Sequence, residues 1–316
     1  MKIHEIRAIE VSEWSHRAVE HMAHMRAASG ALRPSQVRDY IRKNLKRFKV
    51  GTPINSRIFV DEDARNWLWM STSPELEIVD AKIDHFDASW IEAYSSVAGG
   101  KECLINRFRD DRDNFLKSFP QRQVSVSMSA ELPQVNWTPI DGTELAYLRP
   151  MRSDELATYL VLVSNEQGRN MADLNPNANA NTLVRKVYRD NEEKLSDGVA
   201  TPGHYLYSIV TNLGVIGGIW AEVDSSSGKI VNCSIDSKFE GRGFRRAAMV
   251  NLADILKSQG VRYLTCDLTP PTQSLRKVLT SVGFSVTTRQ AYILPDAADR
   301  MMLSHVYVHS LHPGML

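Results

Sequence analysis

The second half of the chain switches between two patterns of apolar and polar positions. Apolar and polar residues alternate over 204–210, 215–223 and 229–236, and short turns separate these runs, so three antiparallel strands are predicted. Apolar residues recur at helical spacing over 153–166 and 245–259, which predicts amphipathic helices. The other predicted elements are strands at 144–149, 262–268, 285–293 and 303–311 and helices at 183–197 and 272–282. The predicted order is strand, two helices, three strands, helix, strand, helix and two strands.

The first half repeats this order. Its predicted strands are 3–9, 57–60, 67–70, 76–83, 103–108 and 123–128, and its predicted helices are 13–28, 35–48, 87–97 and 110–118. The polar stretch 120–141 contains several prolines and is typical of a linker, so a boundary is expected near residue 138. We therefore predict an α+β protein with domains at 1–138 and 139–316, each a mostly antiparallel mixed sheet flanked by helices. An unrelated α+β cap is the alternative for the first half.

The composition is that of a globular protein with room for two cores. Of the 316 residues, 43% are hydrophobic and 24% are charged. The formal net charge of +1 gives no field over the whole chain that would favour nucleic acid or an anionic membrane. Cys103, Cys233 and Cys266 are widely spaced in apolar runs, which favours reduced, buried thiols over a disulfide framework or a zinc site. Because no apolar run is long enough to span a membrane, a cytoplasmic protein is expected.

A glycine-rich turn that carries arginines, residues 239–246, joins the predicted strand 229–236 to the predicted helix 245–259. Unpaired N–H groups, the positive end of a helix dipole and two or three guanidinium groups would meet there, which suits a pyrophosphate. An ordinary strand-to-helix turn with solvated arginines is the alternative. The candidate cofactor-binding residues are Ser234, Ile235, Glu240, Gly241, Arg242, Gly243, Phe244, Arg245 and Arg246.

The element order, this turn and the pair Gly283-Phe284 together resemble the GCN5-related N-acetyltransferase (GNAT) superfamily over about residues 144–311. The repeated order resembles the tandem architecture of mycothiol synthase-like enzymes and Fem-type aminoacyl transferases. The first copy is expected to be degenerate, because its corresponding turn near Phe86 has neither paired glycines nor arginines. The resemblance also implies a split between two central strands that admits a pantetheine arm.

The resemblance identifies the glycine-rich turn as the acyl-CoA loop, whose family pattern is Gln/Arg-x-x-Gly-x-Gly/Ala. Residues 240–245 occupy those six positions. The central Gly243 is kept, whereas Glu240 and Arg245 depart from the pattern. Arginine charge is expected to bind phosphate where a glycine is missing.

The resemblance gives no matching side chains for the two groups that transfer protons in the family. The family's tyrosine acid corresponds to Leu279, and its frequent strand glutamate corresponds to Lys229. Asp236, which adjoins the turn, is the first candidate to accept the amine's proton, and Glu222 is the second. Cys233 would lie beside the thioester, but it has no partner that would make it a thiolate, so a core position is expected. The other polar candidates on the central strands are His204, Asn232, Ser234 and Asp267, and an ordinary hydrogen-bonding role is the alternative for all of them.

These observations predict an acyltransferase. It is expected to move an acyl group from acetyl-CoA, another acyl-CoA or a phosphopantetheinyl carrier protein to an amine of a small molecule by direct attack. The doubled order and the basic run within 35–48 leave open a Fem-like transfer from aminoacyl-tRNA. Leu279 and the altered turn leave open a non-catalytic module that binds acyl-CoA or a carrier. No metal is expected, because His16, Glu20 and His24 share a helical face that is interpreted as solvated.

Overall fold

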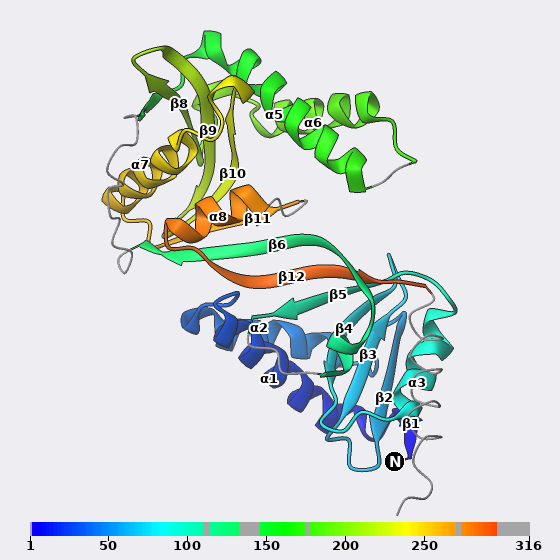
Figure 1. Cartoon of the computed structure of the whole chain (residues 1–316). Helices are drawn as coiled ribbons and strands as arrows, with labels where there is room; N and C mark the ends of the chain where they lie inside the picture. Colours follow the sequence, from blue (N-terminus) through cyan, green and yellow to red (C-terminus); the bar gives the residue numbers. More distant parts are fainter. Residues whose placement is uncertain (1, 110–113, 133–145, 175–176, 270–272, 296–316) are drawn as a thin grey trace, which may run out of the picture. The chain divides into compact units, whose positions relative to one another are not determined.

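The computed structural model describes residues 2–109, 114–132, 146–174, 177–269 and 273–295 (Figure 1). The chain forms two compact units, which are Met1–Val124 with Thr287–Leu316 and Ser125–Val286. Each unit contains a mixed, mostly antiparallel sheet flanked by helices, which confirms the predicted α+β class.

The sheet of the first unit has the strand order β1-β2-β3-β4-β5-β12. Neighbouring strands are antiparallel except β4 and β5, which are parallel. The strands are β1 (Ile3–Glu5), β2 (Ser56–Asp61), β3 (Trp67–Ser71), β4 (Glu77–Lys82), β5 (Cys103–Phe108) and β12 (Ser285–Ile293). The helices are α1 (Val11–Ser29), α2 (Val37–Leu45), α3 (Ala88–Ala98) and α4 (Asn114–Ser118).

Strand β3 separates the two cores of the first unit. Trp67 and Trp69 point to one face, where Trp14 of α1 meets Trp69 edge to face with ring centroids 5.7 Å apart. Leu68 and Met70 point to the other face, into a core that includes buried residues of α3. Because side chains alternate along a strand, one short run fills both cores, with α1 and α2 on one side and α3 on the other (Figure 1).

The sheet of the second unit has the strand order β6-β11-β10-β9-β8-β7. Only β10 and β11 are parallel to each other. The strands are β6 (Gln121–Glu131), β7 (Tyr147–Pro150), β8 (His204–Thr211), β9 (Gly214–Asp224), β10 (Ser227–Ile235) and β11 (Tyr263–Leu268). The helices are α5 (Ser153–Leu174), α6 (Ala180–Lys194), α7 (Phe244–Ser258) and α8 (Gln273–Ser281).

Two separate cores lie on the faces of this second sheet. Tyr159 and Leu160 of α5 pack against Trp220 on one face, and Leu252 and Leu256 of α7 belong to the larger core on the other. Helix α5 runs to Leu174, two turns beyond its predicted end at Glu166. This extension positions polar residues of α5 against β10, as described below. Among the described helices, none is long and apolar enough to cross a membrane.

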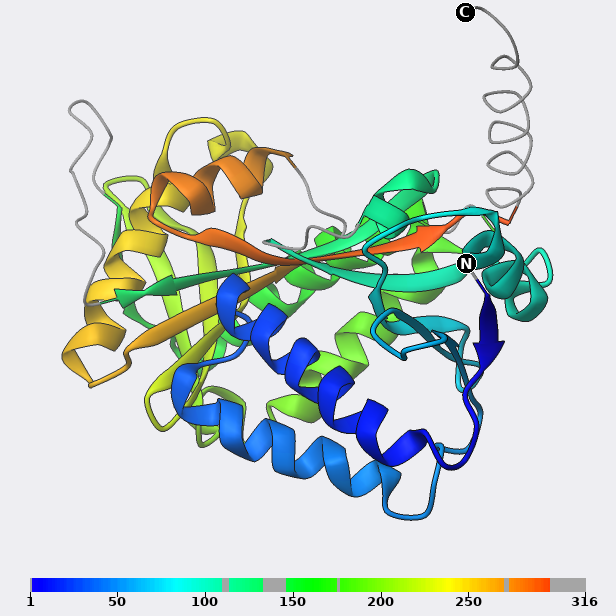
Figure 2. The same ribbon diagram turned by 90° about the horizontal axis from the view of Figure 1, so that it is seen from below.

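Two strands pair differently from what their positions in the sequence suggest. The last predicted strand of the first half is β6, and its residues 126–131 pair with β11 in the second unit. Conversely, β12 follows α8 in sequence, yet its residues 288–293 pair with β5 in the first unit (Figure 2). Both compact units therefore differ from the predicted ranges 1–138 and 139–316. The predicted boundary residue 138 and the predicted strand 303–311 lie outside the described residues.

An ion pair holds the start of α5 against the edge of the second sheet. Glu155 accepts hydrogen bonds from Arg149 of β7 (Nη1 to Oε2, 2.9 Å, with a second bond from Nη2) and from the hydroxyl of Ser208 (2.7 Å). The bonds from Arg149 outweigh the opposite effect of burial and lower the pKa of Glu155 from 4.5 to about 2. This carboxylate is thus part of what fixes the position of α5.

Replacing Glu155 with Gln is expected to lower the free energy of unfolding at neutral pH by about 1–3 kcal/mol, the usual size for hydrogen bonds to a charged group. Because the folded carboxyl has the lower pKa, its stabilisation is present above about pH 5 and is lost as the pH falls towards about 2. Urea denaturation of both proteins at several pH values measures this. The matched control Asp154→Asn alters a 71% exposed carboxylate and should change stability by less than about 0.5 kcal/mol. A difference between Glu155→Gln and wild type that stays constant down to acid pH would contradict the assignment.

Candidate functional site

A gap opens between the parallel strands β10 and β11 of the second unit. Within these two fully described strands, the pairing runs from Ser227 opposite Tyr263 to Ile230 opposite Cys266. A β-bulge between Ile230 and Asn232 then shifts the register of β10 against β9. From this point β10 follows β9 while β11 follows β6, so the two strands separate.

A narrow cavity of about 70 Å³ lies in this gap. Its lining consists of Glu166, Gln167 and Asn170 of α5, residues 230–233 of β10, Met249 of α7, residues 266–268 of β11, Thr269 and Leu275. Apolar side chains and strand backbone therefore surround a slot that also contains the two carboxylates of Glu166 and Asp267. Such a slot suits an extended chain with a few polar groups better than a compact ligand.

The glycine-rich turn lies directly after β10 and opens α7. Gly241 and Gly243 have φ of 77° and 82°, in the left-handed region that a residue with a Cβ seldom adopts. Gly243 is the N-cap of α7 and has no side chain that could occupy the helix terminus. Ala247 makes the first helical bond, from its N–H to the Gly243 oxygen (3.0 Å), so the N–H groups of Phe244 and Arg245 precede the hydrogen-bonded turns. This is the open, positive helix terminus that the sequence predicts.

Arg245 explains why two departures from the family pattern are compatible with this turn. It belongs to the first turn of α7 and has helical backbone, so no glycine is needed there. Its guanidinium lies 3.2 Å from Glu240 Oε1 and 3.7 Å from Glu166 Oε1, and its side chain is 16% exposed. The charge of Glu240 is therefore balanced by Arg245.

The other predicted cofactor-binding residues divide between the core and the rim of the turn. Ile235 and Phe244 are buried, and Phe244 anchors the start of α7 in the larger core. Arg242 is exposed and its guanidinium lies 5.3 Å from the centre of the Phe244 ring. Arg246 is partly buried at the same helix terminus. The rim thus presents cationic groups above an apolar anchor.

Helix α5 directs a polar row onto the part of β10 that follows the bulge. The hydroxyl of Tyr159 donates to Asn232 Oδ1 (3.2 Å), and the buried hydroxyl of Ser234 hydrogen-bonds with Asn232 (2.7 Å) and with Glu166. Sequence reasoning missed Glu166 because the helix was expected to end there. The spacing of seven residues from Tyr159 to Glu166, two helical turns, is the signal that places both on one face.

Asp236, the first predicted proton acceptor, has a structural task in the turn. Its carboxylate accepts from the backbone N–H of Lys238 (3.2 Å) and pairs with the Lys238 ammonium (3.2 Å). These contacts lower the pKa of Asp236, which makes it a weaker base. Asp236 lines a separate cavity with Glu155 and Tyr159, outside the lining of the β10–β11 gap. Its catalytic role stays a prediction.

Glu222, the second predicted proton acceptor, belongs to a polar row that crosses the sheet. It lies opposite His204 of β8 and Lys229 of β10 in register, and its Oε1 is 3.9 Å from His204 Nδ1. Lys229 in turn pairs with Asp267 (2.9 Å), which accepts from the hydroxyl of Ser127 on β6 (2.6 Å). Burial raises the pKa of Asp267, but its bonds to Ser127 and Lys229 outweigh burial and lower it. Glu222 lies outside the lining of the gap, and its catalytic role also stays a prediction.

Two residues have no part in proton transfer in this arrangement. Leu279 is fully buried in the larger core, on the face of α8 that packs against α7. Burial raises the pKa of Cys233 to about 12, so this thiol is protonated at neutral pH and does not act as a nucleophile. Groups of three or more His, Cys, Asp or Glu side chains that could hold a metal are absent from the described part of the chain.

Comparisons with known proteins agree with this geometry. No family model matches the chain. A stretch of 147 residues is 24% identical to the uncharacterised N-acetyltransferase YycN of Bacillus subtilis, over 44% of this chain and 92% of that protein. The structure of a GCN5-related N-acetyltransferase from Sphaerobacter thermophilus covers 93% of this chain and 96% of its own, with a TM-score of 0.50 and 13% identity. The chain has the GNAT fold.

The GNAT element order occurs in both halves of the chain, so the predicted tandem architecture is confirmed. A tandem GNAT protein from the clavulanic acid biosynthesis pathway covers 92% of this chain and 98% of its own, with a TM-score of 0.40 and 12% identity.

The first GNAT copy keeps the bulge but differs at the helix terminus. A register shift again precedes Asp80 of β4, and β4 pairs with β5 at two positions only, Glu77 with Leu104 and Ile78 with Ile105. Here, however, the N-cap of α3 is Asp87, whose carboxylate accepts from the N–H of Ser89 (3.0 Å). An anionic side chain therefore occupies the terminus that the second copy leaves open at Gly243.

The three cysteines are expected to be unreactive in the native protein. All are free and buried, and burial raises the pKa of each to about 12. At pH 8 only about one thiol in ten thousand is then ionised. Titration with Ellman's reagent should detect almost no thiol in the native protein and all three in guanidinium chloride. Rapid labelling of Cys233 in the native state, located by mass spectrometry, would contradict this assignment.

Proposed function

We propose that the second GNAT copy is an N-acyltransferase that moves an acyl group from acyl-CoA to an amine of a small molecule. The observation that carries the proposal is the combination of an open, glycine-capped helix terminus with a strand gap next to it. The GNAT fold and the similarity to a protein named as an N-acetyltransferase support it. The 24% identity to that protein supports the reaction class.

The terminus of α7 is the proposed place for the donor's pyrophosphate. The N–H groups of residues 243–246 and the guanidinium groups of Arg242 and Arg246 would bind the phosphate oxygens. Glu240 forms an ion pair with Arg245, so the negative charge of Glu240 beside the phosphate is neutralised. In the first copy the carboxylate of Asp87 would repel a phosphate, so we propose one donor site per chain.

The gap between β10 and β11 is the proposed place for the pantetheine arm and the thioester. Beyond Ile230 the edge of β10 that faces the gap is not paired with β11, so its backbone can hydrogen-bond an extended ligand. A backbone N–H of β10 is the proposed donor to the thioester oxygen as negative charge develops on it. The amine attacks the carbonyl carbon and the thiolate leaves, without an acyl-cysteine step because Cys233 is protonated and buried.

Glu166 is the proposed group that accepts the amine's proton. Among the carboxylates of the site, Glu166 and Asp267 line the gap. Asp267 is held by Lys229 and Ser127, which lower its pKa and leave it less able to accept a proton than an unpaired aspartate. Glu166 also contacts Ser234 and Arg245, so it couples the gap to the turn.

Two other donors and a non-catalytic role remain as alternatives to this proposal. Part of the basic run in the first half already has partners, since Arg42 pairs with Asp39 (2.9 Å) and Arg47 lies over the Trp69 ring (5.4 Å). This leaves less charge for tRNA or a carrier protein, and we favour acyl-CoA. The free, buried cysteines suit a reducing compartment such as the cytoplasm.

Removing one cation from the turn tests the donor site. Arg246→Gln is expected to weaken acetyl-CoA binding about 10- to 100-fold, as for loss of a charge-assisted hydrogen bond. Isothermal titration calorimetry measures the dissociation constant. The matched control Lys257→Gln removes an exposed cation from the other end of α7 and should leave it unchanged. If the wild-type protein binds no CoA species, the acyl-CoA proposal is wrong and the carrier and tRNA donors gain support.

Removing single carboxylates identifies the proton acceptor. Glu166→Gln is expected to lower kcat about 100- to 10,000-fold, the usual contribution of a general base. Its KM for acetyl-CoA should change far less. CoA release measured with a thiol reagent over a panel of small amines gives both constants. Asp236→Asn and Glu222→Gln serve as comparisons, and a large loss of kcat in either of them with full activity in Glu166→Gln would transfer the role to that residue.

A further inference from the structure

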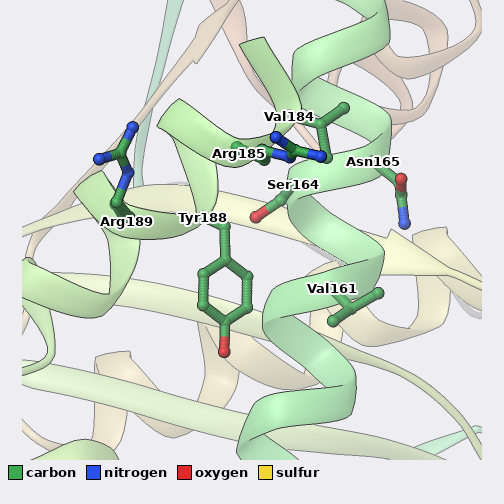
Figure 3. Close-up of a pocket in the computed structure, with 7 residues that line it drawn as sticks. All are labelled: Val161, Ser164, Asn165, Val184, Arg185, Tyr188 and Arg189. Carbon is green, nitrogen blue, oxygen red and sulfur yellow. The ribbon is translucent and has the colours of Figure 1, made fainter. Parts of the chain in front are cut away.

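Another hollow lies between helices α5 and α6, and it shares no lining residue with the strand gap (Figure 3). It has a volume of about 540 Å³, which is in the range of small-molecule sites. It is lined by Val161, Ser164 and Asn165 of α5 and by Val184, Arg185, Tyr188 and Arg189 of α6. We call this hollow the α5–α6 groove.

The groove and the proposed acyl-donor site use opposite faces of α5. Glu166 contacts β10 and Arg245, whereas Ser164 precedes it by two residues, or about 200° around the helix. The two helices touch next to the groove, because a Cβ on Gly168 would lie 2.6 Å from Val184 Cα. Direct packing therefore closes one end of the groove, where Val184 contributes both to this contact and to the lining, whereas the lining residues of α5 lie about one turn or more before Gly168.

Ser164 gives the groove an unsatisfied polar atom. This residue is 1% exposed, and its hydroxyl has no hydrogen-bond partner within the described residues. Figure 3 shows the hydroxyl directed into the space between the helices, on the same side as Tyr188. Buried hydroxyl groups in proteins nearly always have a partner, so a bound group at this point would complete its hydrogen bonding.

Two arginines give the groove a positive charge. Arg185 and Arg189 are one helical turn apart and exposed, and the ion pairs found between described residues include neither of them. Two unpaired like charges at this spacing on one helix repel each other, and an anion between them removes that repulsion. Val161, Val184 and the ring of Tyr188 supply apolar surface beside them.

We propose that the α5–α6 groove is a binding site for a small organic anion with an apolar body. Arg185 and Arg189 bind the anionic group, Ser164 and Asn165 hydrogen-bond with polar atoms of the ligand, and Val161, Val184 and Tyr188 cover its apolar part. This ligand is distinct from the acyl donor, which is proposed for the other face of α5. The site stands independently of the proposed acyltransferase activity.

The matched pair 3-phenylpropionate and 3-phenylpropionamide tests the site, because the two differ in charge but hardly in shape. Ligand-induced shifts in the NMR spectrum of the full chain are expected to saturate for the acid, with a dissociation constant of about 1 mM or tighter, and to centre on α5 and α6. The amide should bind at least about 10-fold more weakly. Absence of saturable shifts with the acid, or equal affinity for the amide, would overturn the proposal.

Variants locate the binding within the groove. The double change Arg185→Gln with Arg189→Gln should weaken binding of the acid at least about 10-fold, and Ser164→Ala should weaken it by a smaller factor. Lys186→Gln is the matched control, because it removes an exposed cation from α6 without altering the lining. Acetyl-CoA affinity should be unchanged in all three, which separates this site from the donor site. Undiminished binding of the acid by the double variant would show that the groove is not its site.

Discussion

The bulge in β10 between Ile230 and Asn232 is the constraint on which the candidate site depends. Before the bulge, β10 and β11 satisfy each other's backbone groups, and no ligand can enter between them. After it, each strand keeps only its outer partner, and a slot with backbone polar groups on its wall is the result. The same bulge turns Asn232 and Ser234 towards α5, so the gap and its polar lining have one origin.

Local electrostatics distinguish the two copies more sharply than their folds do. Both copies have a register shift in the fourth strand of their own order and a short parallel pairing before it. The difference lies at the helix that follows, where Gly243 leaves the terminus open and Asp87 fills it with a carboxylate. One N-cap residue therefore decides which helix terminus is open and which is filled by a carboxylate, a difference that the net charge of +1 does not reveal.

The element order and the glycine-rich turn were predictable because they depend on local rules. Periods of two and 3.6 residues specify strands and helices, and Gly241 and Gly243 are required by a left-handed backbone. Glu166 was not predictable in the same way, since its role depends on a helix that continues to Leu174 and on contacts with Ser234 and Arg245. Asp236 was a candidate because it adjoins the turn in the sequence, and the sequence did not show that its carboxylate also binds Lys238 and supports the turn itself.

The sequence by itself determined the α+β class, the doubled order of elements and the glycine-rich turn before α7, because these follow from periodicity and from single residues with special backbone needs. Only the tertiary structure decided that β6 pairs with β11 and that β12 pairs with β5. These pairings determine which residues belong to each compact unit. The reason is physical: alternation of side chains fixes the faces of a strand but leaves its two hydrogen-bonding edges equivalent. The pairing of Ser127 with Asp267, 140 residues apart, is decided by such an edge.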